Sequence, residues 1–274
     1  MGDIVFAGII PHDLCIIESL AGEDKNLFIK TRASIEQVTK KFIEEKPDVI
    51  IVLTPHGLRL RNYTAVYTTE YCSGSFTSGN QCESLTYKCS KALSENILLS
   101  SEKENISVVG CNYGALEGPH SNIAMDWGTF VPLWFLKELQ ETVEVVVIGP
   151  TRDTSLEELE LFGKIIANEI ENTDKRVGII ASADQGHCHS NEGPYGYNPA
   201  SKIYDSFINK CLKEDNLKDV IKVNKEIVEN GKPDSLWQMV ILSGALRKTD
   251  LSAEFMSYEA PTYFGMTVAG FFRR

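Results

Sequence analysis

The sequence lacks an excess of positive charge, and its beginning lacks a long apolar run. Its 274 residues include 27 lysines and arginines against 38 acidic residues, so the net charge is 27 − 38 = −11. Nucleic-acid backbones and anionic membranes attract basic surfaces, so we expect neither as a partner. The first residues, MGDIVFAGIIPHD, lack the basic start and the length of a signal or membrane segment. A cytoplasmic location is therefore expected.

The sequence also lacks paired cysteines and the common nucleotide and esterase motifs. Its seven cysteines are odd in number and scattered, which favours reduced thiols over a disulfide framework. No G-x-x-x-x-G-K-[ST] loop and no G-x-S-x-G turn is present. A P-loop nucleotide site and a serine hydrolase of the elbow type are thus not expected.

Short β-rich runs alternate with longer helical patterns along the chain. Four of the strand candidates are apolar throughout, which is typical of strands buried on both faces. The expected strands are Ile4–Ile10, Val49–Leu53, Tyr63–Thr69, Ile106–Val109, Val143–Ile148 and Val177–Ala181. The expected helices are Ser34–Glu45, Leu156–Ile170, Ile203–Leu212, Leu217–Val228 and Leu236–Leu246. The segment Tyr71–Asn80 (YCSGSFTSGN) is expected to be a loop.

This alternation predicts the α/β class: a single domain, residues 1–274, with a mainly parallel central sheet flanked by helices. In such sheets ligands bind beyond the carboxyl ends of the strands. Any metal or substrate site is therefore expected at that edge.

Histidines follow three of the expected buried strands. The run IVFAGIIPH ends at His12, VIIVLTPH ends at His56, and VGIIASADQGH ends at His187. Parallel strands would bring these three of the five histidines to one edge of the sheet. A single histidine of this kind is more often a loop or core residue, but a cluster of imidazoles is typical of transition-metal sites.

Glu259 is a candidate third ligand. It is the only acidic residue in the apolar and aromatic stretch FMSYEAPTYFGMTVAGFF. A buried carboxylate is costly unless it is paired or bound to a metal. An ion pair with an arginine such as Arg273, or a surface position, explains Glu259 equally well from composition alone.

Five short motifs in order resemble the class III extradiol ring-cleaving dioxygenases. They are the first PH, then PHG, ASADQGH, GPYGYNP and YEAPTYFGM, and they extend from about His12 to Met266. The sequence resembles in particular the catalytic, LigB-type subunit of protocatechuate 4,5-dioxygenase and its relatives. Each motif alone is weak evidence for this family, whereas all five motifs in this order are fairly specific for it.

The resemblance implies a non-haem Fe(II) site with His12, His56 and Glu259 as ligands, and zinc as a substitute. It implies His187 as the acid–base residue. It further implies a small aromatic substrate and O2 as reactants, a homodimer, and in some relatives a small second subunit. Tyr195, in GPYGYNP, is a candidate for the cavity entrance; a mobile glycine-rich loop is the competing interpretation.

One family motif is altered. The family has Asp-His-Gly before a helix, whereas this chain has Asp126-Trp127-Gly128 followed by TFVPLWFL. Tryptophan can stack on a ring, but it cannot exchange a proton at neutral pH. Asp126 and Trp127 are therefore expected beside the substrate. His120 and His189 are candidates to replace the missing imidazole, although an exposed loop position is the simpler expectation for His120.

The sequence therefore predicts an extradiol dioxygenase-like enzyme acting on a catechol, an aminophenol or a related aromatic. Two alternatives remain. Histidines with a carboxylate also serve zinc hydrolases, and a binding or scaffold protein can retain the fold without activity, as the similar Memo family does. Fold alone does not decide among these.

Overall fold

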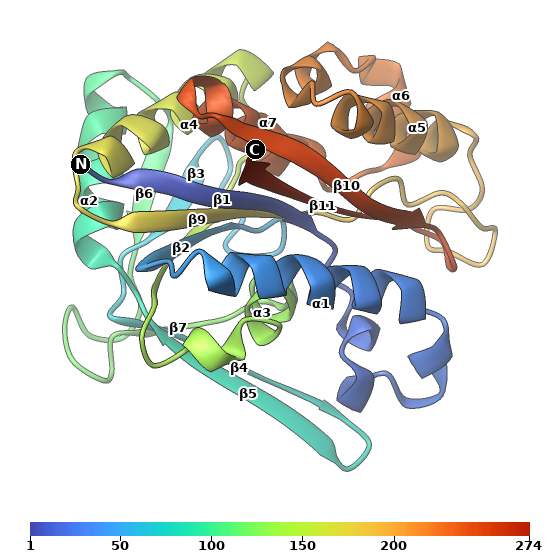
Figure 1. Ribbon diagram of the computed structural model, residues 1–274, viewed down its shortest axis with the longest axis horizontal. Coiled ribbons are helices and arrows are strands. Elements are labelled where there is room, and N and C mark those ends of the chain that lie inside the picture. Colours follow the sequence, from blue (N-terminus) through green and yellow to red (C-terminus); the bar gives the residue numbers. More distant parts are fainter.

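An eight-stranded mixed sheet forms the centre of the protein, as seen in the computed structural model of residues 1–274 (Figure 1). Its strands lie in the order β10-β11-β1-β9-β2-β8-β3-β6. Their bounds are β1 Asp3–Ile10, β2 Val49–Leu53, β3 Thr64–Tyr67, β6 Val108–Cys111, β8 Glu144–Gly149, β9 Arg176–Ser182, β10 Leu251–Glu259 and β11 Met266–Arg273.

The middle of this sheet is parallel. The neighbouring pairs β1–β9, β9–β2, β2–β8 and β3–β6 are parallel, whereas β1–β11, β10–β11 and β3–β8 are antiparallel. The register pairs Ile10 with Ser182 and Leu53 with Ala181. The carboxyl ends of β1, β9 and β2 therefore lie next to one another, and the chain segments that follow them start at one edge.

Helices cover both faces of the sheet (Figure 1). Figure 1 shows α1 and α3 on one side, and α4, α5, α6 and α7 on the other. The helices are α1 Ile29–Glu44, α2 Lys91–Lys103, α3 Trp127–Trp134, α4 Leu156–Glu171, α5 Ala200–Lys213, α6 Lys225–Gly231 and α7 Leu236–Ala245. Short 3₁₀ helices are η1 Leu14–Ile16, η2 Glu18–Leu20, η3 Gly22–Asn26, η4 Lys137–Leu139, η5 Leu217–Lys222 and η6 Leu246–Lys248.

The two-sided burial is visible in single strands. In β2, Ile51 belongs to the apolar core beneath α4 and α7, while its neighbours Ile50 and Val52 belong to the core beneath α1 and α3. Side chains of a strand alternate between faces, so a strand covered on both sides must be apolar at every position. The expected α/β class with a mainly parallel, helix-flanked sheet is confirmed.

Most expected elements are present, with shifted ends. One expected helix, 217–228, is divided into η5 and α6, with Val223 and Asn224 extended between them. The sequence prediction did not include α2, β5, β7, β10 and β11.

A second, three-stranded sheet contains the segment that was expected to be a loop. It has the order β5-β4-β7, with β4 Tyr71–Ser78, β5 Gln81–Lys88 and β7 Asn122–Ala124. Figure 1 shows β4 and β5 as a long hairpin that extends from the body of the protein. The loop prediction for 71–80 is wrong because cross-strand pairing with β5 over the whole length of β4 outweighs the low β-propensity of its serines and glycine.

None of the helices combines the length and the apolar character that crossing a membrane requires.

Candidate metal centre and substrate cavity

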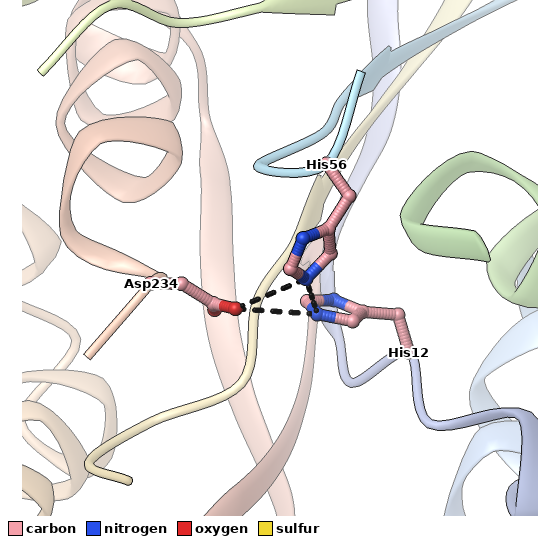
Figure 2. Close-up of side chains that lie close together, drawn as sticks. All are labelled: His12, His56 and Asp234. Atoms are coloured by element: carbon pink, nitrogen blue, oxygen red, sulfur yellow. Dashed lines mark hydrogen bonds and ion pairs between the residues drawn. The ribbon is translucent and has the colours of Figure 1, made fainter. Parts of the chain in front are cut away.

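Two histidines and one aspartate converge at the carboxyl edge of the sheet. His12 follows β1, His56 follows β2, and Asp234 lies between α6 and α7. The Nε2 atoms of His12 and His56 are 3.0 Å apart. The Oδ2 atom of Asp234 is 3.5 Å from the first nitrogen and 3.2 Å from the second. Figure 2 shows the three side chains pointing toward one another.

This group fits a divalent transition metal. One ligand atom from each residue lies within 4.8 Å of the others, and two imidazoles with one carboxylate are typical of non-haem iron and of zinc. The two Nε2 atoms face each other, so at least one carries a proton unless a cation lies between them. His12, His56 and Asp234 are therefore the residues that would hold an ion.

The charges of the group also favour a bound cation. Burial lowers the pKa of His12, but Asp184 and Asp234 outweigh it and raise the pKa to about 9. Burial would raise the pKa of Asp234, yet His12 and His56 hold it well below its usual range. His12 is only 1% exposed. A positive charge is thus stabilised at this buried point, and a metal ion would supply it in place of a proton.

The segment that follows β9 positions the first histidine. Ser182 Oγ lies 3.0 Å from His12 Nδ1, which fixes the ring with Nε2 toward the group. Asp184 Oδ1 accepts a hydrogen bond from the backbone N–H of His12 at 3.1 Å. The backbone N–H of Asp184 donates in turn to Asp234 Oδ1 at 3.1 Å. These hydrogen bonds connect three chain segments: the ones that follow β1 and β9 and the one that precedes α7.

Glu259 does not belong to this group, which corrects the expected ligand set. Its Oε1 accepts hydrogen bonds from the backbone N–H and the hydroxyl of Thr31, in the first turn of α1. The physical reason is the strand order: β10, which Glu259 ends, is the edge strand, and β11 separates it from β1. Two strand spacings of about 4.8 Å place it away from the histidines. Asp234 is the carboxylate that meets them.

The sequence gave little indication that Asp234 is a candidate metal ligand. It precedes Ser235 at the start of α7, in KPDSLW, where an aspartate is ordinarily explained as a helix-start residue. Its burial follows from the packing of α7 on α4 and β9, which no local pattern encodes. An aspartate before a helix as apolar as LWQMVILSGA was the one available clue.

His187 lies beside the group. Its Nε2 is 3.8 Å from Asp234 Oδ2. Its Nδ1 is 2.8 Å from the carbonyl oxygen of Gln185, which can only accept, so Nδ1 donates and Nε2 is left as the acceptor. Burial lowers the pKa of His187. The ring is therefore neutral, with a free lone pair beside the group.

The three histidines and Asp234 line one cavity of about 630 Å³, a volume that suits a small organic ligand. Arg59, Arg152 and Lys232 also line it. The remaining lining residues are Asp13, Leu14, Cys15, Trp127, Asp184, Pro194, Tyr195, Tyr263 and Phe264.

Comparison with known proteins identifies the family. The family model described as "Catalytic LigB subunit of aromatic ring-opening dioxygenase" matches residues 7–270. The chain belongs to this family. The expected resemblance is thereby confirmed.

Two similar proteins have names that state no function. "Protein CA_C1420" of Clostridium acetobutylicum is 28% identical over 252 residues, which are 92% of this chain and 54% of that protein. This chain thus spans about half the length of that relative. The crystal structure of the uncharacterized protein JW3007 from Escherichia coli K12 covers 97% of this chain and 99% of its own, with a TM-score of 0.59 and 11% identity. It shows the same fold.

Trp127, in the segment Asp126-Trp127-Gly128, stacks on the candidate metal ligand His56. The ring of Trp127 lies 4.2 Å from the ring of His56, with 27° between their planes, and it lines the cavity. Asp126 does not line it. Its Oδ1 accepts hydrogen bonds from Thr54 Oγ1 at 2.6 Å and from the backbone N–H of Thr129, so that it caps α3. Asp126 therefore fixes the position of Trp127 rather than touching a ligand in the cavity.

Of the two remaining candidates, Tyr195 lies at the cavity and His120 does not. Tyr195 lines the cavity, and its ring centroid is 6.5 Å from that of His187. His120 is exposed and is not among the cavity residues. His120 therefore does not replace the missing imidazole, because it lies in the turn before β7 with its backbone oxygen bonded to Ala115. His189 does not either, since its Nε2 is engaged 2.7 Å from Asp205 Oδ2.

Proposed function

We propose that this protein is a non-haem Fe(II)-dependent ring-opening dioxygenase that uses O2 to cleave a catechol, an aminophenol or a related aromatic. The observation that carries the proposal is the convergence of His12, His56 and Asp234 beside a neutral His187 in one cavity. Two imidazoles and one carboxylate leave positions free on an iron for substrate and O2. Membership of the LigB family supports the reaction class.

Each side chain has a role in this proposal. Iron, when bound, supplies the redox centre through which an electron-rich ring can react with O2. His12, His56 and Asp234 hold it, and Ser182 and Asp184 orient His12. The His187 Nε2 atom accepts the proton of a substrate hydroxyl and later returns it, a contribution of about 10²–10⁴-fold in rate.

The cavity wall suits an aromatic ring. Phe264 stacks on the imidazole of His187, with centroids 5.5 Å apart and planes 24° apart, and Tyr263 lies beside it. Trp127 stacks on His56, another residue of the cavity wall. Aromatic walls bind a flat ring and exclude water. Because Trp127 cannot exchange a proton, His187 is the residue that transfers protons in this chain.

Anaerobic reconstitution with Fe(II), followed by a panel of catechols and aminophenols in air-saturated buffer, tests the function. We expect O2 uptake, a coloured ring-opened product and one iron per chain. His187→Ala should keep the iron and lose about 10²–10⁴-fold in turnover. Glu192→Gln, an exposed change in the following loop, is the control.

A contrary result is equally clear. If stoichiometric iron is bound and no member of the panel causes O2 uptake, the dioxygenase proposal is wrong. Ester or amide hydrolysis by the zinc-loaded protein would then favour the hydrolase alternative, and its absence would favour a scaffold protein. A cytoplasmic location, a homodimer, a small second subunit and a single domain over 1–274 remain predictions.

A further inference from the structure

A chain of buried polar side chains lies behind the candidate acid–base histidine. Its members are Gln185, in the segment that follows β9, Ser235, which precedes α7, and Tyr204 of α5. All three residues are fully buried. Burying polar groups costs free energy unless they are hydrogen-bonded, so the partners of these three side chains indicate what they hold in place.

The direction of each hydrogen bond follows from the available donors. The amide Nε2 of Gln185 donates to the carbonyl oxygen of Ala183 at 3.4 Å, which orients the amide and leaves Oε1 as an acceptor. Ser235 Oγ lies 3.0 Å from this Oε1 and donates its single hydroxyl proton to it. The hydroxyl oxygen of Tyr204 lies 2.9 Å from Ser235 Oγ and therefore donates to it. The chain thus leads from Tyr204 through Ser235 to Gln185.

Gln185 in turn acts on His187 through its backbone. The carbonyl oxygen of Gln185 accepts the proton of His187 Nδ1 at 2.8 Å, and the backbone N–H of Gln185 donates to the carbonyl oxygen of Gly265 at 2.7 Å. Rotation of the Gln185 backbone would move this carbonyl away from the imidazole. Because Ser235 holds the side chain of the same residue, it resists that rotation and keeps the proton on Nδ1.

The hydroxyl of Ser235 is not used in the ordinary way. A serine directly before a helix typically accepts a hydrogen bond from a backbone N–H of the first turn. Ser235 forms no such bond with α7, and its hydroxyl contacts Gln185 instead. Since Ser235 directly follows the candidate metal ligand Asp234, this side chain connects the segment of the ligand to the segment of His187.

We propose that Ser235 and Gln185 are positioning residues that orient His187 beside Asp234, and that Tyr204 holds the Ser235 hydroxyl in place. The two segments together keep His187 Nε2, the free acceptor, 3.8 Å from Asp234 Oδ2. This inference rests on the proposed function for the role of His187 in catalysis, but the fixed imidazole tautomer can be measured without any reaction.

The Nδ1 proton of His187 provides that measurement. NMR spectra of the zinc-loaded protein with ¹⁵N-labelled histidine identify the tautomer, and the His187→Ala variant assigns the signals. We expect the Nδ1–H tautomer in the unmodified protein. In Ser235→Ala the Nδ1 proton should exchange with water about tenfold faster, the effect of one lost buried hydrogen bond. An unchanged tautomer with an unchanged exchange rate would overturn the proposal.

Other hydroxyl variants separate positioning from stability. Tyr204→Phe should accelerate the exchange less than Ser235→Ala does, and it carries the test if Ser235→Ala does not fold. Ser235→Thr keeps a hydroxyl and should retain slow exchange. Tyr87→Phe is the matched control, because it removes a buried hydroxyl that donates to two backbone carbonyls and is not part of the cavity. Equal acceleration in Tyr87→Phe would assign the effect to lost stability and contradict the proposal.

Steady-state kinetics of the iron-loaded protein with 4-methylcatechol in air-saturated buffer give a second readout. Ser235→Ala should lower kcat about 10–100-fold, as loss of an outer hydrogen-bond partner typically does, whereas KM and iron content should stay unchanged. A loss of iron that accounts for the whole decrease in kcat would show that Ser235 supports Asp234 rather than His187, and would reject the proposal.

The positioning proposal and the dioxygenase proposal fail separately. Faster exchange of the His187 proton in Ser235→Ala, without O2 uptake by the unmodified iron-loaded protein, would keep the positioning role and reject the reaction. O2 uptake with the same kcat in Ser235→Ala and the unmodified protein, together with an unchanged tautomer and exchange rate, would keep the reaction and reject the positioning role.

Discussion

The indole ring of Trp127 stacks on the imidazole of His56, with 4.2 Å between ring centroids. Trp127 is 41% exposed and lines the cavity, so part of the indole is open to a ligand while the ring also contacts the histidine. Trp127, which was expected at the position of the family's histidine, therefore contacts a candidate ligand directly.

Trp127→Ala should weaken metal binding by about two- to tenfold, because an aromatic pair contributes about 0.5–1.5 kcal/mol and 1.4 kcal/mol is a factor of ten. Trp127→Phe should retain most of the affinity. Competition with a chromophoric chelator measures both. Trp134→Phe, at the opposite end of α3, is the control, and an unchanged affinity in Trp127→Ala would show that stacking does not orient His56.

Substitutions of Asp234 and of Glu259 should have different effects on the metal content of the protein. Asp234→Asn should lose most of the bound metal, since removing even an outer partner of a ligand costs about 10–100-fold in affinity and a direct ligand more. Glu259→Gln should keep it, because Glu259 bonds to Thr31. Elemental analysis after identical loading compares the two. Loss of metal in Glu259→Gln alone would restore Glu259 as the ligand.

Asp205 is predicted to position His187. Its buried carboxylate accepts hydrogen bonds from the backbone N–H of Gly186 at 2.8 Å, from Tyr258 at 2.7 Å and from His189 at 2.7 Å. It thus holds the residue before His187 and a residue shortly after it. Asp205→Asn should lower kcat and leave metal content unchanged.

The same variant should lose about 1.5–3 kcal/mol of unfolding free energy, as expected for a hydrogen bond to a charged group. Chemical denaturation measures this loss, and Glu192→Gln again serves as the control. A variant with normal kcat but reduced stability would assign Asp205 a purely structural role.

Glu83 should make the hairpin contact pH-dependent. Its carboxylate accepts hydrogen bonds from Ser19 Oγ at 2.6 Å and from Trp134 Nε1 at 2.9 Å, which join β5 to η2 and α3. Burial raises the pKa of Glu83, but these two donors outweigh it, so that the pKa lies below its usual value of 4.5. A lowered pKa stabilises the fold above pH 4.5, and the contribution is lost as the pH falls through the folded value.

Glu83→Gln should therefore cost about 0.5–1 kcal/mol at pH 7, a modest value because solvent screens this partly exposed group. The difference from the unmodified protein should shrink as the pH falls below 4.5. Urea denaturation at several pH values measures it. Glu104→Gln, an exposed glutamate at the end of α2, should show no such trend; a constant difference for Glu83→Gln would refute the charge effect.

The strand ends could be predicted because the buried strands leave a strong local signal. Strands covered on both faces are apolar at every position, and proline marks their ends at Pro11 and Pro55. The histidines that follow could thus be placed at one edge of the sheet. This reasoning required no knowledge of which helices cover the sheet.

The carboxylates could not be assigned in the same way. Composition presented Glu259 as an acidic residue without a partner, but Thr31, 228 positions earlier in the chain, supplies its donors. Asp234 was hidden by an ordinary helix-start pattern. Both outcomes depend on contacts between distant segments, which hydrophobic periodicity does not encode.

The candidate ligands come from two parts of the fold. His12 and His56 extend from the central sheet, whereas Asp234 belongs to the connection that leads into α7 of the covering helical layer. An ion bound by all three residues would hold the central sheet and the helical layer together. Stripping it should then make the 232–236 connection more accessible to proteases, so that metal supply would govern the lifetime of the protein as well as its chemistry.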